Sequence, residues 1–105
     1  MFYLVNAFSL NMLTSDANLL VHQVDEKIAA ELAEVCISAV GHADTARVFS
    51  NVLGVPVVCN RTNVTLEKGG LALVGQYSGP RLPEGATTLP EGASIKWLVV
   101  GVKYV

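Results

Sequence analysis

Charged residues are scarce in this sequence. Only 15% of its 105 residues are Asp, Glu, Lys or Arg, and the formal net charge is -2. With seven Lys and Arg in total, the chain has no basic surface of the kind that binds a nucleic-acid backbone, so we expect no duplex nucleic acid as a partner. A disordered chain is also excluded, because 51% of the residues are hydrophobic. Any phosphate group would have to be held by a few placed side chains.

Long hydrophobic runs are missing as well. The longest uncharged segment, Met1–Ser15, is shorter than the run of about 20 apolar residues that spans a bilayer, and it contains Asn6, Ser9 and Asn11. No basic segment precedes it, so a signal peptide is not expected. These features predict a cytoplasmic protein without a membrane partner, located in the host cytoplasm if its source is a virus.

The sequence also has few residues that bind metals. Cys36 and Cys59 lack metal-binding spacing and lie in apolar runs, which is typical of small core residues. The two histidines, His22 and His42, stand alone, and there is no Walker loop, G-x-G-x-x-G or G-x-S-x-G motif. We therefore expect no metal and no cofactor, so that any chemistry depends on proton transfer and electrostatics.

The apolar segments that are present predict an α/β fold in a single domain, residues 1–105. Five segments have the composition of strands: 2–6, 18–24, 57–66, 71–77 and 95–105. Two segments, from residue 26 to about 35 and from about 43 to 53, have the period of helices. We expect a mixed, mainly five-stranded sheet flanked by short helices. The high apolar content further predicts that part of the surface is shared with a second subunit.

Both helices have recognisable ends. Asp25 is a suitable N-cap for the first, and Gly54 followed by Pro56 is a typical end for the second. The spacing predicts a buried stripe on each helix, formed by Ile28, Leu32 and Val35 on the first and by Ala46, Phe49 and Leu53 on the second.

The segments 57–66 and 71–77 are predicted to form a hairpin with residues 67–70 as its turn. Its register would place Arg61 opposite Gln76, with their Cβ atoms about 5 Å apart on one face of the sheet. One interpretation is an arginine packed on the sheet surface. The other is a pair of polar side chains that clamps a ligand.

His42 is the main candidate for chemistry. It lies at the predicted start of a helix, where free N–H groups and the helix dipole attract anions, and an imidazole exchanges protons near neutral pH. A helix-capping or half-buried histidine is the alternative. Asn6, Ser9 and Asn11 follow the first strand, and ligands gather beyond the carboxyl ends of strands in α/β sheets. These three could equally satisfy the backbone of their own loop.

Residues 78–93 are rich in proline and glycine and are predicted to form a loop. Within this loop, Arg81 could bind a phosphate with two hydrogen bonds, and Glu84 could pair with a histidine. Most loop arginines and glutamates do neither. The sequence LPEGA occurs at residues 82–86 and again at 89–93, so Glu91 repeats the local setting of Glu84.

Five short motifs appear in order along the chain: LVNAFSLNML at residues 4–13, SAVGHADTA at 38–46, Asn60-Arg61, Gln76, and RLPEG at 81–85. In these motifs the sequence resembles the viral anti-CRISPR ring nucleases. The first motif is long and unusual enough to be specific, and the order of the others strengthens the resemblance. Only the first LPEGA copy follows an arginine at the family's spacing, which favours Glu84 over Glu91.

The resemblance implies a small homodimer that binds cyclic tetra-adenylate, the second messenger of type III CRISPR systems. It implies metal-independent cleavage to linear di-adenylate with a 2′,3′-cyclic phosphate, which shuts off the signal. His42 would be the general acid, with Glu84 supporting it. The ring would be held by Asn6, Ser9, Asn11, Gly41, Arg61, Gln76 and Arg81.

The sequence departs from the family in one segment. Family members usually carry a helix between the RLPEG-like motif and the last strand, whereas residues 86–93 are short and contain Pro90. We therefore expect a reduced or differently built lid. The alternatives to a nuclease are a protein that binds cyclic oligoadenylate without cutting it, and a small interaction protein of the same fold.

Overall fold

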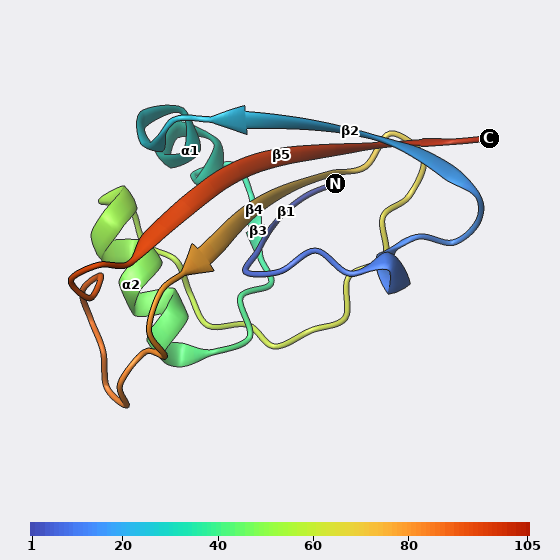
Figure 1. The fold of residues 1–105 in the computed structure, drawn as a ribbon. Helices are drawn as coiled ribbons and strands as arrows, with labels where there is room; N and C mark the ends of the chain where they lie inside the picture. The colour runs from blue at the N-terminus through green and yellow to red at the C-terminus, as the bar shows by residue number, and fades with distance from the viewer.

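The fold is built on one sheet of five strands in the order β2-β5-β4-β1-β3, which a computed structural model describes over all residues 1–105 (Figure 1). The strands are β1 (Phe2–Val5), β2 (Ala17–Val24), β3 (Ile37–Ser38), β4 (Leu71–Ser78) and β5 (Ser94–Tyr104). The helices are α1 (Glu26–Ala33) and α2 (Ala43–Leu53), with a 3-10 turn at Leu10–Met12. The sheet is mixed, because β1 runs parallel to β3 and β4 while β5 runs antiparallel to β4 and β2. The predicted fold class is confirmed.

The sheet separates two apolar layers. One face packs against the helices through a core that includes Leu4, Leu73 and Trp97 of the strands. The other face is covered by loops, chiefly through Val64 and Leu66. Neither helix is both long and apolar enough to cross a membrane.

Helix α2 forms as its sequence predicts. The predicted stripe of Ala46, Phe49 and Leu53 is buried, and Gly54 ends the helix in the left-handed conformation at φ 71°. The ring of Phe49 meets Trp97 of β5 edge to face, with centroids 4.9 Å apart. This contact crosses directly over Gly75 of β4, where an added Cβ would lie 2.5 Å from Phe49 Cζ and 2.6 Å from Trp97 Cζ3.

Helix α1 begins as predicted, but its buried face was predicted wrongly. The Asp25 side chain accepts a hydrogen bond from the Ile28 N–H at 2.8 Å. However, Ile28 is 42% exposed, and Val35 lies beyond the end of the helix and is 70% exposed. The buried residues are Ala29 and Ala33. Leu32, the third residue of the predicted stripe, is partly buried and packs against the same core, so the prediction fails for Ile28 and Val35 but not for Leu32.

Residues 57–66 do not form a strand, and the predicted hairpin is wrong. This segment makes one isolated parallel bridge, between Val40 and Cys59, and otherwise runs as a loop over the sheet. Strand β4 already pairs with β1 on one side and β5 on the other, so neither of its edges is open to a hairpin partner. Gln76 therefore lies opposite Lys96 instead of Arg61.

Two smaller differences from the prediction remain. The segment after α1 contains the short strand β3, which was not among the predicted strands and pairs with β1. Cys59 is exposed, and Cys36 is only partly buried, so the two cysteines are not both core residues. The exposure of Cys59 follows from its place in the loop at residues 57–66, outside the sheet.

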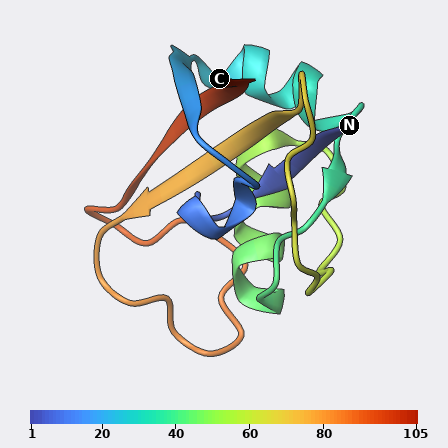
Figure 2. The same ribbon diagram turned by 90° about the vertical axis from the view of Figure 1, so that its right-hand side faces the viewer.

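The parallel strands determine where functional side chains gather. The carboxyl ends of β1, β3 and β4 lie at the same edge of the sheet, because these three strands are parallel. Helix α2 begins after β3, and the loop at residues 79–93 follows β4. Figures 1 and 2 show this loop beside the start of α2, on the side of the molecule away from β2.

Candidate functional site

His42 occupies the N-cap position of α2. Its backbone carbonyl accepts the first helical hydrogen bond, from the Ala46 N–H at 3.0 Å, but its side chain makes no capping bond. The imidazole is exposed. The capping and half-buried alternatives are therefore excluded, and the ring is free to meet a ligand beside the unpaired N–H groups of the helix start.

The imidazole faces a hollow of about 550 Å³, which we call the histidine hollow. It is formed where the start of α2, the end of β4 and the following loop meet, and its lining comprises His42, Asp44, Thr45, Tyr77, Gly79, Arg81 and Leu82. The Tyr77 hydroxyl donates a hydrogen bond to the Pro80 carbonyl, which fixes the start of the loop. His42 and Arg81 are thus brought to one hollow, although they lie 39 positions apart in the sequence.

Glu84 lies next to this hollow and not in it. It lines an adjoining hollow of about 490 Å³ together with Asp44, Arg81, Leu82 and Pro83. The two hollows share Asp44, Arg81 and Leu82. Glu84 and His42 form no ion pair, since the one ion pair in the chain joins Arg47 and Asp44.

Asp44 anchors the turn that carries Glu84. Its Oδ1 accepts a hydrogen bond from the Gly85 N–H at 3.1 Å and is paired with the Arg47 guanidinium. The Arg47 Nε–H in turn donates to the Ala86 carbonyl at 3.4 Å. The turn itself is closed by the Ala86 N–H donating to the Pro83 carbonyl at 3.0 Å.

The second LPEGA copy makes the same turn without such an anchor. The Ala93 N–H donates to the Pro90 carbonyl at 3.1 Å, and Gly92 has a φ of 81°, close to the 80° of Gly85. No side chain of α2 hydrogen-bonds to this second turn, in contrast to the first. The sequence analysis did not predict this role of Asp44 and Arg47. The signal available was an acidic residue followed three positions later by an arginine in the first turns of a helix.

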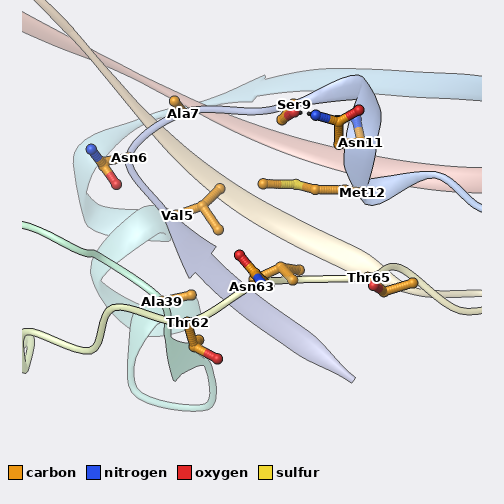
Figure 3. Close-up of a pocket in the computed structure, with 11 residues that line it drawn as sticks. Val5, Asn6, Ala7, Ser9, Asn11, Met12, Ala39, Thr62, Asn63 and Thr65 are labelled. Atoms are coloured by element: carbon orange, nitrogen blue, oxygen red, sulfur yellow. Dashed lines mark hydrogen bonds between the residues drawn. The ribbon is translucent and has the colours of Figure 1, made fainter.

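Asn6, Ser9 and Asn11 line a separate hollow of about 560 Å³, which we call the amide hollow. Figure 3 shows the loop after β1 on one side of it and the segment Thr62–Thr65 on the other. The complete lining is Val5, Asn6, Ala7, Ser9, Asn11, Met12, Ala39, Thr62, Asn63, Val64 and Thr65. Thr62, Asn63 and Thr65 were not predicted, because the sequence assigned them to a strand.

Gly41 and Arg61 lie between the two main hollows. The Cβ that Gly41 lacks would lie 3.4 Å from Arg61 Cγ, so the arginine stem packs on the backbone beside His42. Thr62, the next residue after Arg61, lines the amide hollow. Gln76 lies exposed on β4, and like Gly41 and Arg61 it lines none of these hollows.

Comparisons with known proteins agree with this fold. The sequence profile of the STIV B116-like family matches residues 2–96. The chain belongs to this family. The solved structure of B116 of Sulfolobus turreted icosahedral virus (STIV) superimposes with a TM-score of 0.81 at 27% sequence identity, covering 94% of this chain and 97% of that chain. No curated protein sequence matches the chain.

The predicted membership of a viral protein family is therefore confirmed. The STIV B116-like match contains every candidate residue, from Asn6 at the end of β1 to Glu84 in the anchored turn. The site thus lies wholly within the part of the chain that the family shares.

The side chains of this STIV B116-like protein bear on two kinds of chemistry, metal binding and reaction of the Cys36 thiol. No three of its histidine, cysteine, aspartate and glutamate side chains gather where they could hold a metal ion. Burial raises the pKa of the Cys36 thiol from 9.0 to about 11, so this cysteine stays protonated near neutral pH. The arrangement suits proton transfer by His42 and anion binding by Arg81 and the start of α2.

Proposed function

We propose that this protein is a metal-independent ring nuclease. It binds cyclic tetra-adenylate and cleaves it to linear di-adenylate with a 2′,3′-cyclic phosphate, which shuts off type III CRISPR signalling in the host cytoplasm. The observation that carries the proposal is the meeting of His42 and Arg81 in one hollow at the start of α2. The motif resemblance along residues 4–85 supports it independently.

The residues present match the needs of this reaction. RNA carries its own nucleophile, the ribose 2′-oxygen, which attacks the neighbouring phosphorus while its proton leaves to solvent. The bond from phosphorus to the 5′-oxygen breaks, and the protonated His42 imidazole gives its proton to that oxygen. A histidine acid contributes typically about 10²–10⁴-fold to such a step. Most of the remaining acceleration comes from alignment of the reacting atoms.

Charge that develops on the phosphate needs donors nearby. Arg81 lines the same hollow as His42, and the first N–H groups of α2 are unpaired within the helix. The stem of Arg61 packs on Gly41, one residue from His42, and in this proposal Arg61 is the second cation that binds the ring. Glu84 supports His42 from the adjoining hollow, which shares Asp44, Arg81 and Leu82 with the histidine hollow.

A homodimer suits the symmetry of the ligand. A ring of four equivalent nucleotides presents two opposite phosphates, and a two-fold axis would place one His42 at each of them. Each chain then makes one cut, and two cuts release two di-adenylate products. Asn6, Ser9 and Asn11 would hold the parts of the ring that lie outside the histidine hollow.

The decisive experiment is incubation of labelled cyclic tetra-adenylate with the protein in excess EDTA, followed by separation of the products. We expect linear di-adenylate ending in a 2′,3′-cyclic phosphate. Activity that disappears in EDTA and returns with a divalent ion would contradict the metal-independent mechanism. Tight binding without any product would contradict the nuclease and indicate a protein that sequesters the ring. The absence of binding would contradict both functions.

A further inference from the structure

The amide hollow differs chemically from the histidine hollow. None of its eleven lining residues carries a charge, whereas the histidine hollow is lined by His42, Asp44 and Arg81. The amide hollow is therefore unsuited to a phosphate, which binds cations and helix starts. Its volume of about 560 Å³ is ample for one planar heterocycle and its sugar.

The lining combines a flat apolar base with free amides. Val5, Ala39 and Val64 are buried beneath the hollow, and Met12 lies across it from the Asn63 segment (Figure 3). The side-chain oxygen of Asn63 points into the gap between the two walls (Figure 3). The hydrogen bond within this lining joins the Asn11 N–H to Ser9 Oγ at 3.2 Å, which leaves the amide of Asn63 unengaged.

We infer that the amide hollow is an adenine subsite in which Asn63 reads the edge of the base. This inference rests on the proposed function and extends it to a residue and a base specificity. An amide offers one donor and one acceptor side by side, which matches N7 and the 6-amino group of adenine. Guanine and hypoxanthine present two acceptors at the same edge and need two donors, as an arginine or lysine provides. No arginine or lysine lines this hollow.

The chain connects this subsite to the reacting centre. Ala39 lines the amide hollow three residues before His42, and Thr62 lines it one residue after Arg61. Gly41 and Arg61 are in contact between the two hollows. A nucleotide whose base enters the amide hollow therefore has its phosphate directed across this contact, toward the histidine hollow.

The test compares two ring ligands by calorimetry, cyclic tetra-adenylate and cyclic tetra-inosinate, which differ only at the base edge. A His42→Ala background slows cleavage, so that little of the ring is cut during the measurement. We expect the adenine ring to bind about tenfold more tightly or better, as one bidentate amide contact provides. Asn63→Leu, which keeps the size of an exposed side chain but removes its donor and acceptor, should reduce that ratio to near one. The matched control is Asn51→Leu, the same exchange on the exposed side of α2.

The informative quantity is the ratio of the affinities for the adenine ring and the hypoxanthine ring. Effects of a substitution on phosphate binding or on folding change both affinities equally and cancel in this ratio. Equal binding of the two rings by the background protein, or an unchanged ratio in Asn63→Leu, would overturn the adenine subsite while ring binding itself stands. Failure of the background protein to bind either ring would overturn the subsite and the proposed function together.

Discussion

Oδ1 of Asp44 accepts a hydrogen bond from the backbone N–H of Gly85 at 3.1 Å, across 41 residues of sequence. This bond joins the first turn of α2 to the loop after β4, so that His42 and Glu84 are held on neighbouring surfaces. The ion pair between Asp44 and Arg47 keeps the accepting carboxylate in place.

The anchor should determine how ordered the Glu84 turn is. Asp44→Ala removes the acceptor, so we expect faster hydrogen exchange at the Gly85 amide and weaker binding of cyclic tetra-adenylate. Asp44→Asn keeps an oxygen acceptor and should retain most of the protection. Amide exchange followed by NMR checks this, with Asp16→Ala, at an exposed residue before β2, as the control. Unchanged exchange at Gly85 in Asp44→Ala would show that the bond does not order the turn.

Removal of the general acid should slow cleavage while leaving binding largely intact. We expect His42→Ala to reduce the single-turnover rate by about 10²-fold or more, because the leaving 5′-oxygen then departs unprotonated. His22→Ala changes the other histidine, which is exposed on β2, and should cleave at the normal rate. A His42→Ala variant that cuts as fast as the unaltered protein would exclude His42 as the acid.

The two repeated glutamates should differ in effect. Glu84→Gln keeps the shape of the side chain but removes its negative charge from the hollow beside His42, so the rate of cleavage should fall. Glu91→Gln should change little, because no side chain of α2 hydrogen-bonds to its turn and exposed charges contribute less than about 0.5 kcal/mol. Rates of both variants from pH 5 to 9 decide the assignment. If Glu91→Gln is the more damaging change, the second turn serves the site.

The contact across Gly75 should make this position intolerant of any side chain. In Gly75→Ala the new methyl group would lie 2.5 Å from Phe49 and 2.6 Å from Trp97, so we expect a loss of about 1–3 kcal/mol or more in the free energy of unfolding. Gly101→Ala, in the adjacent strand β5, is the matched control, because its methyl group would meet nothing nearer than Leu71 at 3.5 Å. Urea denaturation measures both, and equal losses would contradict the packing argument.

The two cysteines should react at different rates. Cys59 is exposed, whereas burial raises the pKa of Cys36 to about 11 and keeps it in the unreactive thiol form. Mass spectrometry after brief alkylation at pH 8 should find the label on Cys59. Between pH 9 and 11 the unfolded chain loses a thiol proton that the folded chain keeps, so the free energy of unfolding should fall as pH rises, and Cys36→Ala should remove this component. Equal labelling of both cysteines in the folded protein would contradict this account.

The parts of the fold that depend on local signals were predictable from the sequence. The stripe on α2, its end at Gly54 and the strands β4 and β5 follow from spacing and turn residues. The segment 57–66 has equally good strand composition, yet it remains outside the sheet because β1 takes the edge of β4 that a hairpin would need. A pairing between Phe2–Val5 and a strand some seventy residues later leaves no local signal.

The candidate site likewise has parts that the sequence predicts and parts that it does not. His42 could be located because a helix start is recognisable in sequence, and the turn of Glu84 because Pro and Gly mark it. His42 and Glu84 lie near each other because Asp44 accepts a hydrogen bond from Gly85. No sequence pattern indicates that these two segments are in contact. Asn63 was missed because of the wrong strand prediction. That prediction placed it on a face of the sheet, whereas it lines a hollow.

The pairing of β2 has a consequence for synthesis on the ribosome. Strand β2 (Ala17–Val24) bonds only to β5 (Ser94–Tyr104), so some seventy residues must be translated between the two partners. At about 5–20 residues per second, the nascent chain spends several seconds with an apolar, unpaired segment exposed. The parallel strands β1, β3 and β4 can associate during that interval, but the sheet closes only when β5 leaves the exit tunnel. Folding of this protein is therefore completed late, by its last strand.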